Sequence, residues 1–277
     1  RMKDYNASER IGQLAILLLE KFQSRKYISF VHCCVFGCIR GWNGHIKMSI
    51  EPLLSGYQIG MQTGDIQMAM LNAYMYKCSM HICTWWCGQF HLWSTDNFIS
   101  GQLHLAAFKK HLKVFGEQMV EYKQMVFHHL LRPIEQVVSN LLLSTGEPLL
   151  LIGRDKEQEC ILNKAIEQNN GYLAASFFFF GCVEAYIYGD YELAVNFAQK
   201  RHETGFDVPF YGMTDFFDCL SFLAMAHQSG DQKWILSAKK SISNIDYFAK
   251  ICPSNCEHKL LLLQAEMKSM TGEAKEA

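Results

Sequence analysis

The chain has 277 residues, of which 49% are hydrophobic and 19% are charged. This composition supports a large buried core and excludes a chain that is mainly disordered. Lys and Arg number 26 against 27 Asp and Glu, which gives a net charge of -1, so no overall field favours nucleic acid or an anionic membrane surface. We therefore expect partners that are recognised by local surfaces, and no nucleic acid among them.

The two longest apolar stretches are residues 27–39 and 173–188. Neither reaches the ~18–20 uninterrupted apolar residues that a membrane-spanning helix needs, so we expect buried helices and no membrane span. The chain has 11 cysteines, many of them inside apolar runs, which indicates reduced thiols in a cytoplasmic protein rather than a disulfide framework. Because the chain opens at Arg1 and stops inside a repeat, we expect a segment of a longer protein.

Apolar residues recur at helical spacing along most of the chain. The segments with this spacing are residues 9–22, 51–62, 66–83, 121–143, 156–168, 215–227 and 257–270. Alternation with a period of two is not sustained anywhere, so the sequence predicts an all-α fold. The four consecutive phenylalanines at 177–180 cannot share one face of a helix, and they predict a core helix that is packed on several sides.

Glycine is followed by an acidic residue more often than the composition predicts. With 19 glycines and 27 acidic residues, about two such pairs are expected by chance. A left-handed glycine ends one helix and the acidic side chain caps the next, so each pair is a predicted joint between helices. The pairs are Gly64-Asp65, Gly116-Glu117, Gly146-Glu147, Gly189-Asp190, Gly230-Asp231 and Gly272-Glu273.

The joints recur about every 42 residues, which is typical of solenoids built from helix pairs. In the pairs that keep this period, the fifth residue after the glycine is small or aliphatic: Ala69, Leu151, Ala194, Ile235 and Ala277. Gly116-Glu117 fits neither the period nor this rule, and we assign the missing joint near residue 105 to Gly101-Gln102. The sequence thus predicts an α-solenoid of antiparallel helix pairs, with degenerate repeats in residues 1–150 and clearer repeats in 151–277, the last of them truncated.

The joint "GDYELAVNFAQ" at residues 189–199 resembles that of tetratricopeptide (TPR) repeats. The segments 56–76, 169–195 and 257–277 together resemble the helical-repeat region of large multidomain AAA/STAND-type signalling ATPases and sensor histidine or serine/threonine kinases. This resemblance implies a TPR-like scaffold for signal transduction that binds a protein or peptide segment, or adjacent domains of its own chain. The sequence contains no G-x-x-x-x-G-K-[ST] and no kinase-type glycine-rich lid, so ATPase or kinase activity would lie outside this chain.

Candidate metal ligands are concentrated in residues 78–91. Cys83, Cys87 and His91 follow one another at i, i+4 and i+8 and could hold zinc from one helical face. Buried thiols are the alternative, and we favour them, because structural zinc sites usually pair close ligands on a turn with a distant second pair. We therefore expect no cofactor and no metal, with these three residues as the candidates if a metal is present.

Three tryptophans in the same region, Trp85, Trp86 and Trp93, are candidates for contact with a partner. Aromatic residues at helical spacing are more often part of a core, so this alternative stays open. No nucleophile, base and orienting residue can be recognised as a set, and we expect no enzyme. Two other hypotheses remain: a helical enzyme whose active site assembles from dispersed residues, and a metal- or redox-responsive array around residues 78–91.

Overall fold

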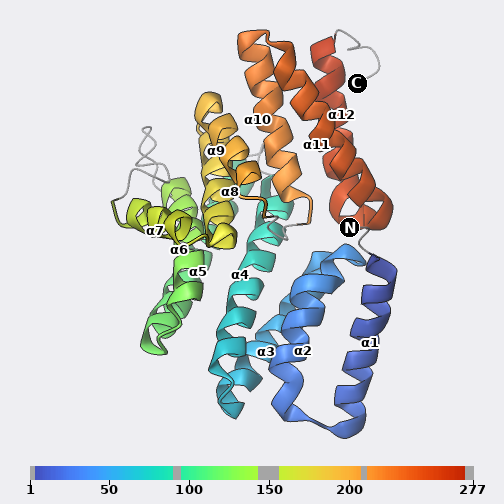
Figure 1. Ribbon diagram of the computed structural model, residues 1–277, viewed down its shortest axis with the longest axis vertical. Helices are drawn as coiled ribbons and strands as arrows, with labels where there is room; N and C mark the ends of the chain where they lie inside the picture. The colour runs from blue at the N-terminus through green and yellow to red at the C-terminus, as the bar shows by residue number, and fades with distance from the viewer. Residues whose placement is uncertain (1–3, 90–94, 143–155, 207–210, 272–277) are drawn as a thin grey trace. The chain divides into compact units, whose positions relative to one another are not determined.

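The computed structural model describes residues 4–89, 95–142, 156–206 and 211–271, and for residues 81–104 it describes no side chains. In these ranges the chain forms helices and turns and no strand, so the all-α prediction is confirmed (Figure 1). Every segment predicted as helical falls largely within a helix. No helix of the described ranges has the length and apolar character needed to cross a membrane.

The chain divides into two units, residues 1–131 and 132–277, with the boundary inside helix α6. The predicted division near residue 150 falls in residues that the structure does not describe, and it stays a prediction. The first unit contains α1 (Tyr5–Phe22), η1 (Arg25–Tyr27), α2 (Ile28–His32), η2 (Cys33–Ile39), η3 (Arg40–Trp42), η4 (Ile46–Ser49), α3 (Ile50–Thr63), α4 (Ile66–Gln89), α5 (Thr95–Glu121) and the start of α6 (Met125–Leu142).

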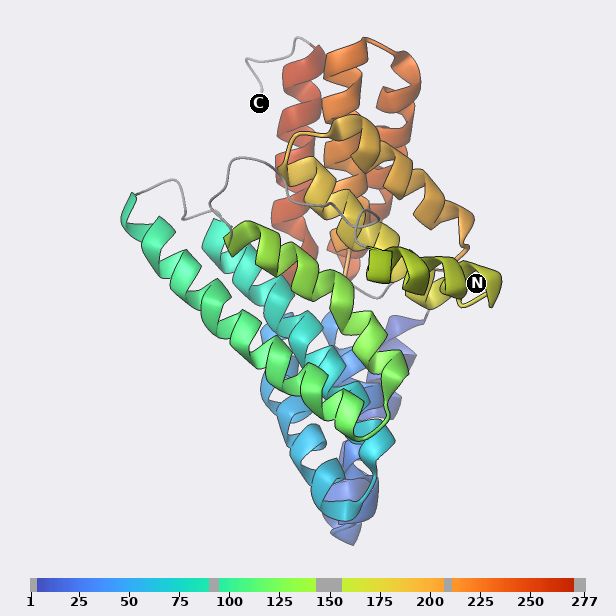
Figure 2. The same ribbon diagram turned by 90° about the vertical axis from the view of Figure 1, so that its left-hand side faces the viewer.

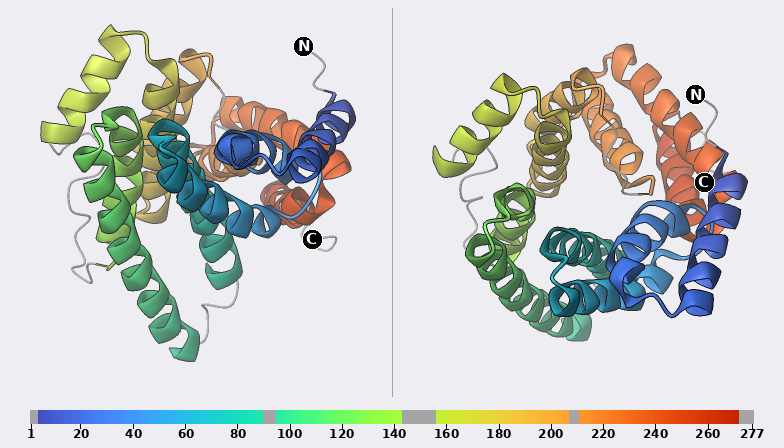
Figure 3. Two further views of the ribbon diagram at one scale, coloured as in Figure 1. Left: turned by 90° about the horizontal axis from the view of Figure 1, so that it is seen from below. Right: turned by 60° about the horizontal axis from the view of Figure 1, so that its bottom comes forward.

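The second unit continues from α6 through six further helices. They are α7 (Lys156–Glu167), α8 (Gly171–Ile187), α9 (Tyr191–Glu203), α10 (Met213–Ser229), α11 (Gln232–Ile251) and α12 (Pro253–Thr271). Each of these helices packs against the next in the chain, α9 against α10 included. In the second view of Figure 3 these helices follow one another in chain order as a curved row.

Three of the predicted joints are present with the expected chemistry. Gly64, Gly189 and Gly230 have φ values of 80°, 78° and 69°, which is the left-handed conformation that ends a helix. The aspartate that follows each glycine then caps the next helix; the carboxylate of Asp190, for example, accepts a hydrogen bond from the Leu193 N–H at 3.1 Å. The predicted joints at 146–147 and 272–273 lie outside the described residues.

A fourth joint uses asparagine in both positions. Asn169 has φ 52°, and the side chain of Asn170 accepts a hydrogen bond from the Leu173 N–H at 3.2 Å. Asparagine tolerates the left-handed conformation and is a good N-cap, so it does here what glycine and aspartate do elsewhere. The fifth residue after Asn169 is the buried Ala174, in agreement with the rule for the other joints.

The predicted joint at Gly101-Gln102 is wrong, because both residues lie inside the unbroken helix α5. One glycine costs a helix only about 1 kcal/mol relative to alanine, and the flanking "LHLAAF" favours helix enough to continue through it. The chain reverses direction instead at residues 122–124, where Lys123 has φ 57° (Figure 2). Gly116-Glu117, which was not counted as a joint, also lies within α5.

The apolar stretch 27–39 is helical, as expected, but it is only partly buried and is not a regular α-helix. It consists of a short 3-10 turn, one turn of α-helix and the π-helix η2, and Tyr27 and Phe30 remain about half exposed. The π-helix is rare and occurs mostly as a single turn within an α-helix. Here Val35 packs against α1 beside Gly12, whereas Gly37 faces the Met75 side chain of α4.

Helix α8 is the core of the second unit. Thirteen consecutive residues, from Leu173 to Ala185, are buried, so α8 is surrounded on all sides. The prediction from residues 177–180 is therefore confirmed. Full burial of one large apolar side chain contributes about 1.5–3 kcal/mol, which makes this helix a large part of the unit's stability.

Close contact between α3 and α4 depends on two glycines of α3. A Cβ atom at Gly56 would lie 2.5 Å from the Oδ1 of Asn72, and a Cβ at Gly60 would lie 2.6 Å from the Oγ of Ser29 and 2.9 Å from the Cβ of Ala69. The same asparagine donates a hydrogen bond from Nδ2 to the Ser29 carbonyl at 2.8 Å. Because these two glycines have no Cβ atom, there is room for a buried hydrogen bond that joins α4 to α2.

We predict that Gly60→Ala lowers the free energy of unfolding by about 1–3 kcal/mol, because the new methyl group overlaps the backbone and side chain of Ala69. Helix propensity alone would change stability in the opposite direction by about 1 kcal/mol. Chemical denaturation with circular dichroism measures the difference. Gln58→Ala, at an exposed position of the same helix, is the control, and a Gly60→Ala protein at least as stable as the wild type would contradict the packing argument.

Candidate functional site

The residues predicted as metal ligands or partner contacts are not placed by the structure. The backbone of Cys83, Trp85, Trp86 and Cys87 belongs to α4, but their side chains are outside the described set, and so are the whole of His91 and Trp93. Their predicted roles stay predictions. Among the side chains that are described, no group of three or more His, Cys, Asp and Glu could hold a metal ion.

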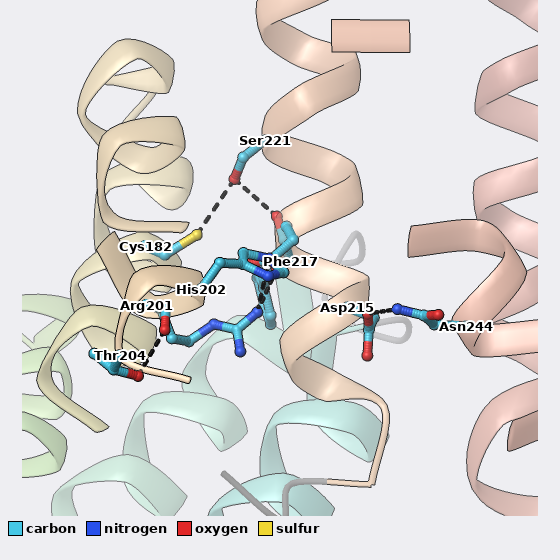
Figure 4. Close-up of polar contacts among 9 residues, drawn as sticks. Cys182, Arg201, His202, Thr204, Asp215, Phe217, Ser221 and Asn244 are labelled. Atoms are coloured by element: carbon cyan, nitrogen blue, oxygen red, sulfur yellow. Dashed lines mark hydrogen bonds and ion pairs between the residues drawn. The ribbon is translucent and has the colours of Figure 1, made fainter. Parts of the chain in front are cut away.

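A buried polar cluster joins α9 to α10 in the second unit (Figure 4). Arg201 is buried and His202 is about half exposed in the last turn of α9, and Asp218 lies in the second turn of α10 with none of its surface exposed. One Nη of Arg201 donates to the Oδ2 of Asp218, and the Nε2 of His202 is hydrogen-bonded to the same oxygen at 2.7 Å. Basic side chains in the last turn also interact favourably with the helix dipole.

Ionisable groups around this cluster favour a structural role. Burial raises the pKa of Asp215, although a hydrogen bond from Asn244 at 2.8 Å opposes the shift. The Cys182 thiol, which is 3.5 Å from the Oγ of Ser221, has a pKa raised to about 12, first by burial and then by the charge of Asp218. A catalytic cysteine needs a lowered pKa, so Cys182 is not an activated thiol beside this aspartate and imidazole.

Lys77 of α4 is a buried cation in the first unit. Its side chain is fully buried, and its Nζ lies 4.7 Å, 5.7 Å and 4.6 Å from the ring centroids of Tyr76, Phe108 and Phe115. The Nζ has no hydrogen-bond partner among the described residues. Burial lowers the pKa of this lysine to about 7, and its charge is also the first cause of the lowered pKa of His111. The faces of aromatic rings attract the ammonium group, but they do not replace the hydrogen bonds that water would make with it.

A groove of about 820 Å³ opens in the second unit between α7 and α9, and α8 forms its floor. The residues that line it recur at helical spacing, so each helix contributes one face. They are Glu159, Leu162, Asn163, Ala165 and Ile166 of α7, Gly171, Ala174 and Phe178 of α8, Leu193, Asn196, Phe197, Lys200 and Glu203 of α9, and Asn169, Thr204 and Phe206 of the turns.

The groove combines an apolar floor with polar walls. Leu162, Phe178 and Phe197 are buried at its base, and the small residues Gly171 and Ala174 keep the floor low. The walls carry exposed amides and charges, and the described residues that line the groove do not form a recognisable set of catalytic groups. A concave, mainly apolar surface with a few polar groups is typical of a binding site.

No family model matches this chain, and no curated protein and no solved structure is significantly similar to it. The candidate sites therefore rest on the geometry alone. Sequence reasoning missed the cluster at Asp218 and the cage around Lys77, although each of these two residues is a charge inside an apolar helical run. That pattern signals a buried charge, but it does not show which residues surround it.

We predict that Arg201→Met lowers the free energy of unfolding by about 3–5 kcal/mol, because it leaves the carboxylate of Asp218 buried without its main partner. The double variant Arg201→Met with Asp218→Leu should recover much of the loss, since it removes the unpaired charge as well. Urea denaturation of both variants measures this coupling. The control is Lys239→Met at an exposed site of α11, and a double variant no more stable than the single one would refute the ion-pair explanation.

We predict that Lys77→Met raises the free energy of unfolding below pH 7 by about 3–5 kcal/mol, because it removes a cation that burial disfavours. In the wild type the unfolded chain binds this proton up to pH 10.5 and the folded chain only up to about 7, so stability rises between these values. The advantage of the variant should therefore shrink as pH rises from about 7 to 10.5.

Denaturant unfolding at several pH values measures this dependence, and NMR titration of His111 provides a second observation. The pKa of His111 should rise when Lys77 is replaced, because the positive charge beside it is removed. An equal stability difference at all pH values, with an unchanged His111 titration, would show that Lys77 is charged and well solvated in the folded protein.

Proposed function

We propose that this chain is a non-catalytic, TPR-like helical scaffold within a multidomain signal-transduction ATPase or kinase of the cytoplasm, where it binds a partner protein or couples adjacent domains. Its helix pairs would form an α-solenoid, and each pair would bury its apolar face against its neighbours. ATPase or kinase activity would belong to other parts of such a protein.

The observation that carries this proposal is the recurrence of one joint. A left-handed residue, then a capping side chain and then a small or aliphatic residue follow one another at Gly64, Asn169, Gly189 and Gly230. The starts of α8, α10 and α12 are separated by 42 and 40 residues, close to the period of the sequence pattern. A repeated supersecondary unit whose neighbours bury its apolar faces is the basis of solenoid proteins.

Two further observations support a binding role rather than catalysis. The groove between α7 and α9 offers a concave surface, while the thiol nearest to the Asp218 cluster has a raised pKa. The cysteines whose side chains are described are free thiols, which suits a reducing compartment such as the cytoplasm. We therefore do not propose the helical-enzyme alternative.

We predict that random peptides displayed on phage will yield sequences that bind this chain in a one-to-one ratio. A synthetic peptide from the selection should show micromolar affinity by isothermal titration calorimetry and should not be altered chemically during the experiment. Such affinity is typical of transient partner recognition by a preformed groove. If no sequence is enriched over selection against an unrelated helical protein, the proposed binding function is wrong.

A further inference from the structure

We propose that the groove between α7 and α9 binds an extended peptide segment that carries apolar side chains and at least one lysine or arginine. This inference rests on the proposed scaffold function and adds the site and the chemistry of the partner. The occupant would be a segment of another protein, extended so that its main-chain hydrogen-bonding groups are free.

Three asparagines supply the match to a peptide main chain. Asn163 lies on the α7 wall, Asn169 at the turn and Asn196 on the α9 wall, and all three are exposed. Their carboxamides make no hydrogen bond to any described residue. Each carboxamide offers an acceptor and donors, as does each peptide unit of a bound segment. The main-chain groups of a helix are already bonded to one another, so free amides of this kind favour an extended segment.

The apolar part of the groove would take side chains of the same segment. Side chains of an extended peptide point alternately to opposite sides, so every second residue can face the floor formed by Leu162, Phe178 and Phe197. Ile166 and Phe206 line the groove while they remain 51% and 50% exposed. Phe206 lies against Gly171, where a Cβ atom would overlap the aromatic ring. Two half-exposed apolar side chains thus border a buried apolar floor.

The charge of the groove determines which charged side chains the bound segment should carry. The titratable groups that line the groove are Glu159 on α7 and Lys200 and Glu203 on α9, and none of the three is in an ion pair within the described residues. Two carboxylates against one ammonium leave a net negative groove. A lysine or arginine of the peptide would compensate this charge, whereas an acidic peptide would increase the repulsion.

The experiment uses the phage-selected peptide together with an acidic counterpart, in which each Lys and Arg is replaced by Glu. Groove variants of the whole chain are Asn196→Ala and Glu203→Lys. Helix α9 also supplies matched controls, because Gln199 and Glu192 are exposed on it but do not line the groove: Gln199→Ala and Glu192→Lys. Circular dichroism establishes that all four variants remain folded.

We expect Asn196→Ala to weaken binding by about 2–10-fold, as the loss of one or two hydrogen bonds would. Glu203→Lys should weaken binding of the basic peptide by about tenfold and should strengthen binding of the acidic counterpart. The two controls should change either affinity less than twofold.

The outcomes separate this inference from the proposed function. If the selected peptide binds the wild type, but the groove variants and their controls bind equally well, the scaffold function stands and the groove assignment is overturned. Helical circular dichroism of the bound peptide would overturn the extended conformation, and a selection dominated by acidic sequences would overturn the charge preference. Failure to select any peptide would count against the function and the groove together.

Discussion

The second unit depends on the burial of helix α8 along its whole central length. A helix without a polar face must be enclosed, so α7, α9 and α10 are all held against it. This burial also shapes the candidate binding groove. Because α7 and α9 both pack on α8, they leave a groove between them, and the small side chains at Gly171 and Ala174 determine how deep that groove is.

The joints between helices explain how such an enclosure follows from a simple pattern. A left-handed glycine or asparagine reverses the chain within two residues, and the next side chain caps the following helix. Short turns of this kind keep consecutive helices adjacent, and a small residue such as Ala194 then lets them approach closely. Asparagine can replace glycine at these joints, so the helical array is more regular than the spacing of the glycine-acid pairs suggests.

Buried charges within the apolar helices differ in what they contribute to this packing. Asp218 is held by Arg201 and His202 from the neighbouring helix, and it therefore fixes α10 against α9 in one register. Lys77 has no such partner among the described residues and is enclosed by aromatic rings, which makes it a cost to stability below neutral pH rather than a contribution. A buried charge within an apolar helix thus stabilises or destabilises the protein according to the groups that face it.

The sequence by itself determined the helical class, most helix positions and three of the joints, because periodicity and capping act over a few residues. It also determined that the helix around residues 177–180 is buried on several sides, since four successive aromatic side chains leave no polar face. It failed at Gly101, where the local breaker was weaker than the helix around it, and it did not indicate the π-geometry of Cys33–Ile39, whose residues contact α1 and α4.

Only the tertiary structure decided which charges are paired and where a groove opens. Arg201 and Asp218 are 17 residues apart, and the walls of the groove come from helices on either side of α8, so no local pattern indicates that these residues meet. Their proximity depends on helix crossing angles, which are set by side-chain packing summed over whole helices.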